Sequence, residues 1–322
     1  MKKKIALSAL IIIITTIFFL LIATSKSKFI ISRLIYSHNF SLLTHSVFKE
    51  IKEKYITEFK KPNNKFNQSI ILNTYVESVI HPFKNKRDDL VWNVLDDGAS
   101  WKMLDGSIWC DGSADIFIRL SNSIDVNSAI IFLFNKDNVS DHVVAVSDLN
   151  NKTNNFKSLE KINEAFLFDA HFYFLPIDKK REKIDINFMV NNQKEFMTYK
   201  AIDNLNNKKI LFSSNEKTLT EKITYKVGYY LVQFIPKQLF KKIYKFAINI
   251  NPKLDSDYKE FISARVDHLL YDYDSALENY KKIKKSSKYY KGAEHWIDHI
   301  IKTKNKNNDL NEIYENYRKL YY

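Results

Sequence analysis

The sequence of 322 residues predicts an α+β fold with N-terminal helices and an antiparallel sheet, followed by an α-helical C-terminal region. Apolar residues recur at helical spacing from Ser27 to Lys61, as in one or two helices, and again from Ser69 to Ile80. Polar and apolar residues alternate from Arg181 to Leu211, which is typical of strands. Beyond residue 221 the sequence predicts helices again.

Composition narrows the class of protein. Hydrophobic residues make up 45% of the chain and aromatic residues 14%, which is enough for a buried core and excludes a disordered chain. The net charge is +13, and the lysines occur together with many Asn and Ile residues, so the charge reflects either codon bias or a functional basic surface. We expect no nucleic-acid partner, since no module for one is recognisable.

Cysteine and glycine counts exclude several kinds of site. The single cysteine, Cys110, rules out an intramolecular disulfide and a metal site built on thiolates. The 5 glycines form no glycine-rich phosphate loop, which argues against a nucleotide enzyme. We therefore expect neither a cofactor nor a metal.

The N-terminus carries a membrane-targeting pattern. Met1–Lys4 is basic, and Ile5–Ala23 is an uncharged apolar run of 19 residues, long enough to cross about 30 Å of hydrocarbon. A signal anchor over residues 1–25 is one interpretation. A cleaved signal peptide is the other, although Ile22–Thr24 offers no small-x-small cleavage site. The anchor predicts a single-pass protein of the bacterial inner (cytoplasmic) membrane, with the bulk of the chain outside the cytoplasm, in the periplasm.

Cys110 lies at the expected start of a helix. Gly106 and Gly112 interrupt the approach to it, and helically spaced apolar residues follow. The apolar face consists of Ala114, Phe117, Ile118 and Leu120. The positive end of the helix dipole favours a thiolate at that position.

Two further residues complete a candidate catalytic set. His142 opens the apolar run HVVAV, and Asp169 follows the run FLF, so both are expected at strand ends along a common edge. A thiol nucleophile needs a base, and the base needs an acceptor that fixes its tautomer. Cys110, His142 and Asp169 supply these three roles. His171 is an alternative base, because on an extended strand it shares a face with Asp169.

This order of elements, a helix with Cys110, a strand with His142 and a strand with Asp169, resembles the core of the transglutaminase-like superfamily over residues 98–176. The resemblance implies a papain-like core within residues 26–212, with Cys110 as nucleophile, His142 as base and Asp169 as orienting residue. It also implies that the backbone N–H of Cys110 helps to hold the oxyanion.

The function implied is that of a membrane-anchored, extracytoplasmic cysteine acyltransferase or amidohydrolase with a protein or peptide substrate. A thioester would form and be resolved by an amine or by water. Trp101 and Trp109 either pack in the core or line a substrate cleft. The alternative is a catalytically inactive interaction protein in a cell-envelope assembly. The residues Ile108, Val144 and Ala170 favour it, since family members often have glycine, an aromatic residue and proline there.

The C-terminal region, residues 221–322, is expected to be helical after a polar linker at 213–220. Tyr225–Ile250 reads as a basic amphipathic helix that either lies on an anionic membrane surface or docks on the core. The segments DYDSALENY at 272–280 and DLNEIYENY at 309–317 repeat with a period of 37 residues and resemble tetratricopeptide hairpins. We expect such hairpins to bind a protein partner.

Overall fold

The structure of this chain is a computed structural model. It describes residues 24–61, 64–80, 98–106, 108, 110–134, 140–148, 166–168 and 219–305.

Helices make up the described chain before the sheet. They are α2 (Ser25–Ile35), α3 (Leu42–Lys54), α4 (Ile56–Lys60), α5 (Lys65–Val79), α7 (Gly98–Asp105), α8 (Cys110–Ser121) and the short 3-10 helix η1 (Asn122–Ile124). The segment Ser27–Lys61 contains three helices and not one or two, because its backbone breaks twice. Ser41 adopts a left-handed conformation with φ of 48° before α3, and Tyr55 separates α3 from α4.

The strands form one antiparallel meander of order β1-β2-β3. They are β1 (Asn127–Phe134), β2 (Ser140–Asp148) and β3 (Phe166–Phe168). In the register of the sheet, Leu133 pairs with His142, and Ala145 pairs with Phe168. Helix α8 covers β1 and β2, and Phe117 of this helix stacks on Phe168 with ring centroids 4.8 Å apart.

The expected α+β, papain-like core is wrong for the described residues, because they are mostly helical. Their β structure is limited to the short three-stranded meander, which is too small to be the scaffold of such a core. The apolar residues that fill the interior come chiefly from the helices that precede the sheet and the helices that follow it along the chain. The strands predicted at 181–211 lie outside the described residues.

The C-terminal helices are α12 (Leu219–Phe234), α13 (Lys237–Ile250), α14 (Ser256–Leu269), α15 (Tyr273–Lys281) and α16 (Tyr290–Asn305). Pro236 separates α12 from α13, since proline cannot donate within a helix but fits just before its first turn. Asp272 caps α15 by accepting a hydrogen bond from the Ser275 backbone N–H. Helices α14 and α15 pack together as a hairpin that includes the first repeat; the second repeat, 309–317, lies outside the described residues.

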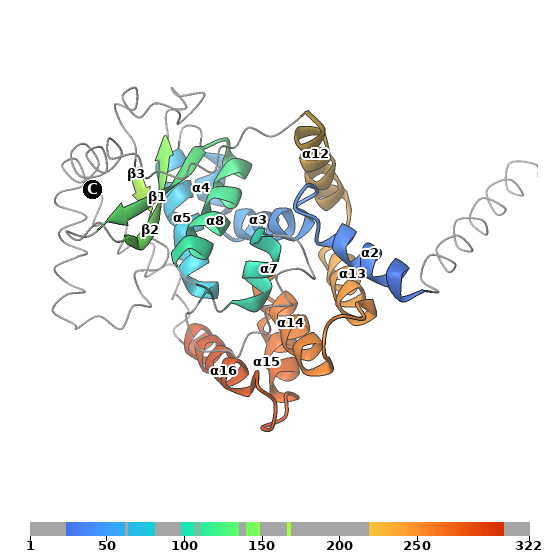
Figure 1. The fold of residues 1–322 in the computed structure, drawn as a ribbon. Coiled ribbons are helices and arrows are strands. Elements are labelled where there is room, and N and C mark those ends of the chain that lie inside the picture. Colours follow the sequence, from blue (N-terminus) through green and yellow to red (C-terminus); the bar gives the residue numbers. More distant parts are fainter. Residues whose placement is uncertain are drawn as a thin grey trace, which may run out of the picture.

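The C-terminal helices pack on the N-terminal ones. Helix α12 lies against α3, and α13 lies against α2 and α14 (Figure 1). Gly228 allows α12 to lie close to the residues just before α3, because a Cβ there would lie 1.9 Å from the carbonyl oxygen of Phe40. Tyr36 donates a hydrogen bond of 3.0 Å to the Tyr244 carbonyl. Residues on both sides of the predicted boundary near 212–221 therefore share one buried core.

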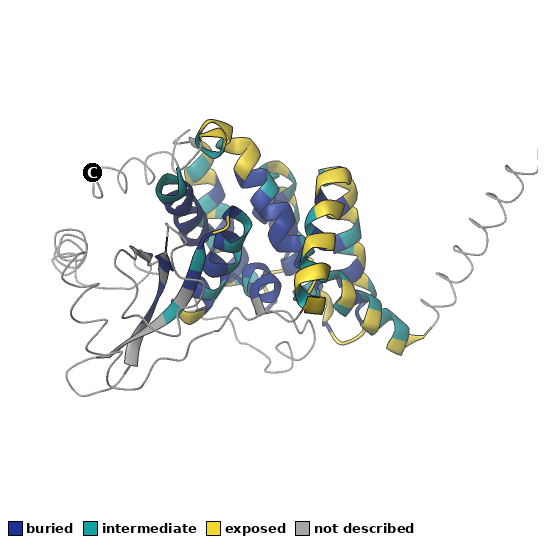
Figure 2. Cartoon of the chain, turned by 90° about the horizontal axis from the view of Figure 1, so that it is seen from above, coloured by how far each residue is buried: buried dark blue, intermediate teal, exposed yellow. Residues whose placement is uncertain are grey.

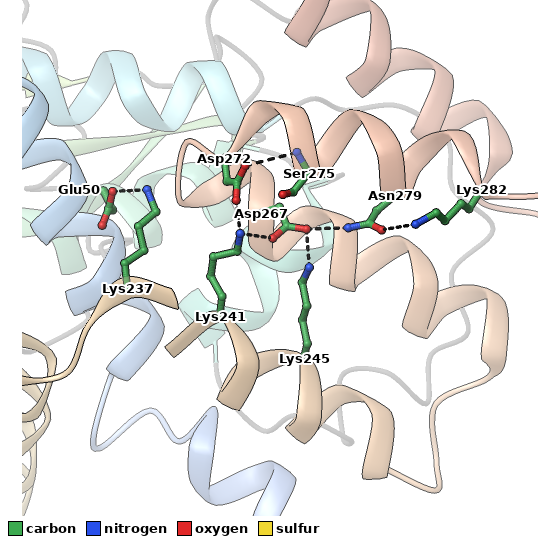
Figure 3. Close-up of polar contacts among 9 residues, drawn as sticks. All are labelled: Glu50, Lys237, Lys241, Lys245, Asp267, Asp272, Ser275, Asn279 and Lys282. Atoms are coloured by element: carbon green, nitrogen blue, oxygen red, sulfur yellow. Dashed lines mark hydrogen bonds and ion pairs between the residues drawn. The ribbon is translucent and has the colours of Figure 1, made fainter. Parts of the chain in front are cut away.

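Basic residues of α13 hold it on the core. The Nζ atoms of Lys241 and Lys245 lie 2.9 Å and 2.5 Å from the carboxylate of Asp267, which is fully buried (Figure 3). Asn279 donates a further hydrogen bond of 2.8 Å to Asp267. Lys237 pairs with Glu50 of α3 at 2.5 Å. The sequence leaves two positions open for Tyr225–Ile250, on an anionic membrane surface or on the core. The second helix of this segment, α13, docks on the core.

A buried arginine links four helices. Arg265 of α14 donates to the carbonyl oxygens of Val79 at 2.5 Å, Met103 at 2.8 Å and Leu104 at 3.3 Å. These carbonyls belong to the last turns of α5 and α7, where carbonyls lack intrahelical partners and the helix dipoles are negative. The guanidinium carbon also lies 4.2 Å from the ring centre of Trp296 in α16.

Gly106 ends α7 beside this arginine. Its φ is +69°, a conformation that favours glycine, and a Cβ would lie 2.7 Å from Nη2 of Arg265. The glycine that the sequence places before Cys110 therefore serves two purposes. It terminates α7, and it leaves room for the guanidinium.

Replacing Arg265 with methionine is expected to lower the free energy of unfolding by at least about 3 kcal/mol, because three buried carbonyls each lose a partner at about 1–3 kcal/mol. Arg265→Lys should restore little, since an ammonium lacks the planar fork that spans two helix ends. Chemical denaturation measures both. Lys282→Met, which removes a lysine that is 59% exposed, is the control and should change stability by less than about 0.5 kcal/mol. A loss in Arg265→Met no larger than in this control would contradict the role given to the guanidinium.

His268 makes the stability of this region depend on pH. Burial, Arg265, His299 and His295 together hold the pKa of His268 well below its usual value. Arg265 Nη1 donates to His268 Nδ1 at 3.2 Å, so the ring is neutral with its proton on Nε2. A protonated ring would lose this bond and face the guanidinium.

The unfolded chain takes up a proton at His268 near pH 6.5, whereas the folded chain does not until a lower pH. Stability should therefore fall as the pH drops below about 6.5, with a slope of up to about 1.4 kcal/mol per pH unit from this residue. Urea denaturation of the parent and of His268→Gln between about pH 5 and 7.5 tests this. The variant should show the shallower slope; identical slopes would show that His268 does not titrate in this way.

Candidate functional site

Cys110 is the first residue of α8, as the sequence predicts. It is a free thiol, partly exposed, and its side chain packs against the edge of the core. The buried side chain of Ile108 lies over the first turn of the helix. A Cβ on Gly112 would be 2.6 Å from Ile108 Cδ1, so the glycine allows this close packing. Ile108 thus helps to hold the segment before Cys110 against the first turn of α8.

The body of α8 is buried along the predicted apolar face. Its buried apolar residues are Ala114, Ile116, Phe117, Ile118 and Leu120. They pack on β1, β2, α5 and α7. Because the first N–H groups of a helix have no intrahelical partners, the start of α8 offers hydrogen-bond donors next to the thiol. These donors and the helix dipole favour negative charge at this position.

The structure places the other predicted site residues only in part. His142 lies in β2, the strand on which α8 packs, and pairs in the backbone register with Leu133; its side chain is outside the described residues. Asp169 and His171 also lie outside them. Phe168, the residue before Asp169, pairs with Ala145 of β2. The described residues therefore contain the helix that carries Cys110 and the strand that carries His142, in contact with each other.

The two tryptophans of the approach differ. Trp101 on α7 is buried, which agrees with the core interpretation of this residue. The side chain of Trp109 lies outside the described residues.

A charged cluster that the sequence interpretation missed joins α7 to α8. Lys102 Nζ on α7 lies 2.8 Å from Asp115 Oδ2 on α8, and Arg119 Nε lies 3.6 Å from Asp115 Oδ1. Arg119 also donates to His38 Nε2 at 2.9 Å. The only local signal was the spacing of Asp115 and Arg119, one helical turn apart.

The cluster holds Asp115 in its ionised form. Burial alone would raise the pKa of Asp115, but the positive charges of Lys102 and Arg119 outweigh it and lower the pKa below its usual value. The ion pair with Lys102 spans the loop between α7 and α8, and that loop contains the residues just before Cys110. It therefore helps to fix the position of the thiol relative to α7.

The predicted membrane anchor, Ile5–Ala23, lies outside the described residues. In the part of the chain that the structure describes, which begins at Thr24, no helix combines the length and the hydropathy that a membrane span requires.

Comparison with known proteins gave no match to this chain among family models, curated proteins or solved structures.

The Asp115 ion pairs should stabilise the fold at neutral pH. Asp115→Asn is expected to lower the free energy of unfolding at pH 7 by about 1.5–3 kcal/mol, the range for hydrogen bonds to charged groups. Because the folded-state pKa is lowered, this contribution is present above about pH 4 and is lost as the pH falls through the folded-state value. Denaturation at several pH values should show the parent and the variant converging in acid.

The matched control is Asp298→Asn, which breaks an ion pair one helical turn apart with a carboxylate that is 62% exposed. It should change stability by less than about 0.5 kcal/mol at any pH. A difference between parent and Asp115→Asn that stays constant down to about pH 2 would argue against the ionised cluster.

Proposed function

We propose that this protein is a membrane-anchored, extracytoplasmic thiol enzyme that acts on amide or acyl groups of protein or peptide substrates. Cys110 is the nucleophile, His142 the base that takes its proton, and Asp169 the residue that orients the imidazole. The proposal rests on these residue types and on the surroundings of α8, and it does not require a papain-like fold.

One observation carries the proposal. Cys110 is the first residue of α8, and the body of that helix packs on β2, the strand that contains His142. Cys110 is partly exposed, as a nucleophile that must receive a substrate has to be. A cysteine that served only packing would be expected on the buried face of α8 and not at its first residue.

The proposed reaction passes through a thioester. The thiolate of Cys110 attacks the carbonyl carbon of an amide, and a tetrahedral oxyanion forms. As the C–N bond breaks, the imidazolium of His142 gives its proton to the departing amine. Water or a second amine then attacks the thioester and loses a proton to His142, and the Cys110 thiolate is released. The N–H groups at the start of α8 favour both the thiolate and the oxyanion.

The place of action follows from the N-terminal sequence. Ile5–Ala23 is proposed as a single span of the bacterial inner membrane, with its basic cap in the cytoplasm and the rest of the chain in the periplasm. Substrates within reach of such an anchor are envelope proteins, peptidoglycan peptides and cell-surface polymers. The hairpin of α14 and α15 is proposed to hold a protein partner.

Thiol alkylation tests the catalytic roles. The full-length protein, reconstituted in vesicles, is treated with iodoacetamide between about pH 5 and 9, and labelling reports on Cys110 alone because the chain has one cysteine. The parent should react readily at about pH 6, where an ordinary thiol is largely protonated. His142→Ala should lower the rate at that pH by about tenfold or more, and Asp169→Asn should lower it less.

His171→Ala is the matched control, since it removes the competing histidine. Loss of reactivity in His171→Ala alone would transfer the role of base to His171. A parent that reacts only as an ordinary thiol would contradict the enzyme and leave the inactive interaction protein as the function. Cys110→Ala provides the unlabelled blank.

A further inference from the structure

Helix α12 has an apolar stripe on its outer side. The five residues of this outer stripe are Leu219, Ile223, Val227, Tyr230 and Phe234, and they are between 43% and 83% exposed. At 3.6 residues per turn they fall within an arc of about 80° on the helix. Single exposed apolar residues are common on protein surfaces, but a continuous stripe along four turns indicates a surface that is covered in use.

The opposite side of α12 is already occupied. Gly228 and Val232 are buried against the body of the protein. His45 of α3 packs on Tyr225, with ring centroids 4.3 Å apart. The helix is therefore apolar on two sides, and its packing within the chain explains only one of them.

Two other helices also carry exposed apolar residues. Of the twelve large apolar side chains exposed in the described residues, six lie on α12, two on α2 and two on α13. Those on α2 and α13 are Ile30, Leu34, Leu239 and Phe246. These three helices lie together at the end of the molecule opposite the sheet, and Figure 2 shows exposed residues along them (Figures 1 and 2). Most of the exposed apolar residues in the described chain thus lie at one end of it.

Lysines border the outer stripe. Lys222 and Lys226 lie one helical turn apart along one edge of the outer stripe, and both are exposed. Lys26 on α2 and Lys242 on α13 are exposed as well. Apolar residues flanked by lysines match the chemistry of a bilayer with anionic headgroups, in which acyl chains lie beneath phosphates.

The N-terminal sequence identifies the occupant. Helix α2 begins at Ser25, directly after the apolar run Ile5–Ala23. A span over this run would bring α2 out of the membrane at the lipid surface, and α2 packs on α13, which follows α12. A lipid surface is therefore the apolar and anionic partner that this end of the protein meets first.

We propose that the outer stripe of α12, with the exposed residues of α2 and α13, docks on the anionic surface of the membrane that holds the anchor. This inference rests on the anchoring part of the proposed function and is independent of the thiol chemistry. Docking fixes the protein against the bilayer at two places, the span and α12. It also sets how far the sheet and α8, at the other end of the molecule, lie from the bilayer.

Lipid quenching in the full-length chain tests the inference. In a Cys110→Ser background, single cysteines at Phe234, Glu278 and Ile12 carry an environment-sensitive fluorophore, and the protein is reconstituted in vesicles that contain lipids with brominated acyl chains. Phe234 probes the outer stripe, Glu278 on α15 is a control position that is 72% exposed, and Ile12 probes the anchor. Quenching at Phe234 should exceed that at Glu278 several-fold and should fall when phosphatidylglycerol is replaced by phosphatidylcholine.

Charge reversal provides a second measurement. Lys222→Glu with Lys226→Glu should reduce quenching at Phe234, whereas Lys284→Glu with Lys285→Glu, the same change at exposed positions beyond α15, should leave it unaltered. Quenching at Ile12 without quenching at Phe234 overturns the docking and leaves the anchor intact. Absence of quenching at both positions overturns the anchor together with the docking. Crosslinking of Phe234→Cys between two copies, without lipid quenching, assigns the stripe to self-association and also overturns the inference.

Discussion

The arrangement of the helices depends on the hydrogen bonds that the buried, positively charged side chain of Arg265 donates. A buried guanidinium is costly unless its donors are satisfied, and here the ends of α5 and α7 supply the carbonyl oxygens. The same side chain packs on Trp296, so it connects α14 with α5, α7 and α16. Gly106 is required beside it both for its backbone conformation and for space.

Arg265 influences the position of the candidate site through α7, the helix that precedes Cys110. The helix ends at Asp105, just before Gly106, and α8 begins at Cys110. The last turns of α7 are held by Arg265 and, through Lys102, by Asp115 of α8. The short segment that leads to Cys110 therefore lies between two helices that are tied together, and a nucleophile there would need little reorganisation before reaction.

Local patterns in the sequence were sufficient for some features and not for others. The apolar face of α8 and the position of Cys110 at its start follow from helical spacing, because that spacing reports which residues are buried. The backbone carbonyls that accept from Arg265 lie 161 to 186 residues away, and no spacing rule reports such contacts. The papain-like core was expected from the order of three short motifs. That order places residues along the chain, but it does not specify how much of the chain is helical, and the described chain is mostly helical. Asp169 and His171 lie outside the described residues, so the site is predicted from sequence at those positions.

We propose above all that His142 of β2 takes the proton of the thiol at the start of α8. The most direct measurement is the distance between Cys110 Sγ and the nearer ring nitrogen of His142 in an experimental structure of the full-length protein. We expect a separation within hydrogen-bond reach of a thiol, about 3–4 Å, with Asp169 on the other ring nitrogen. A His142 ring directed away from α8, at more than about 7 Å from the thiol with no water between them, would contradict it.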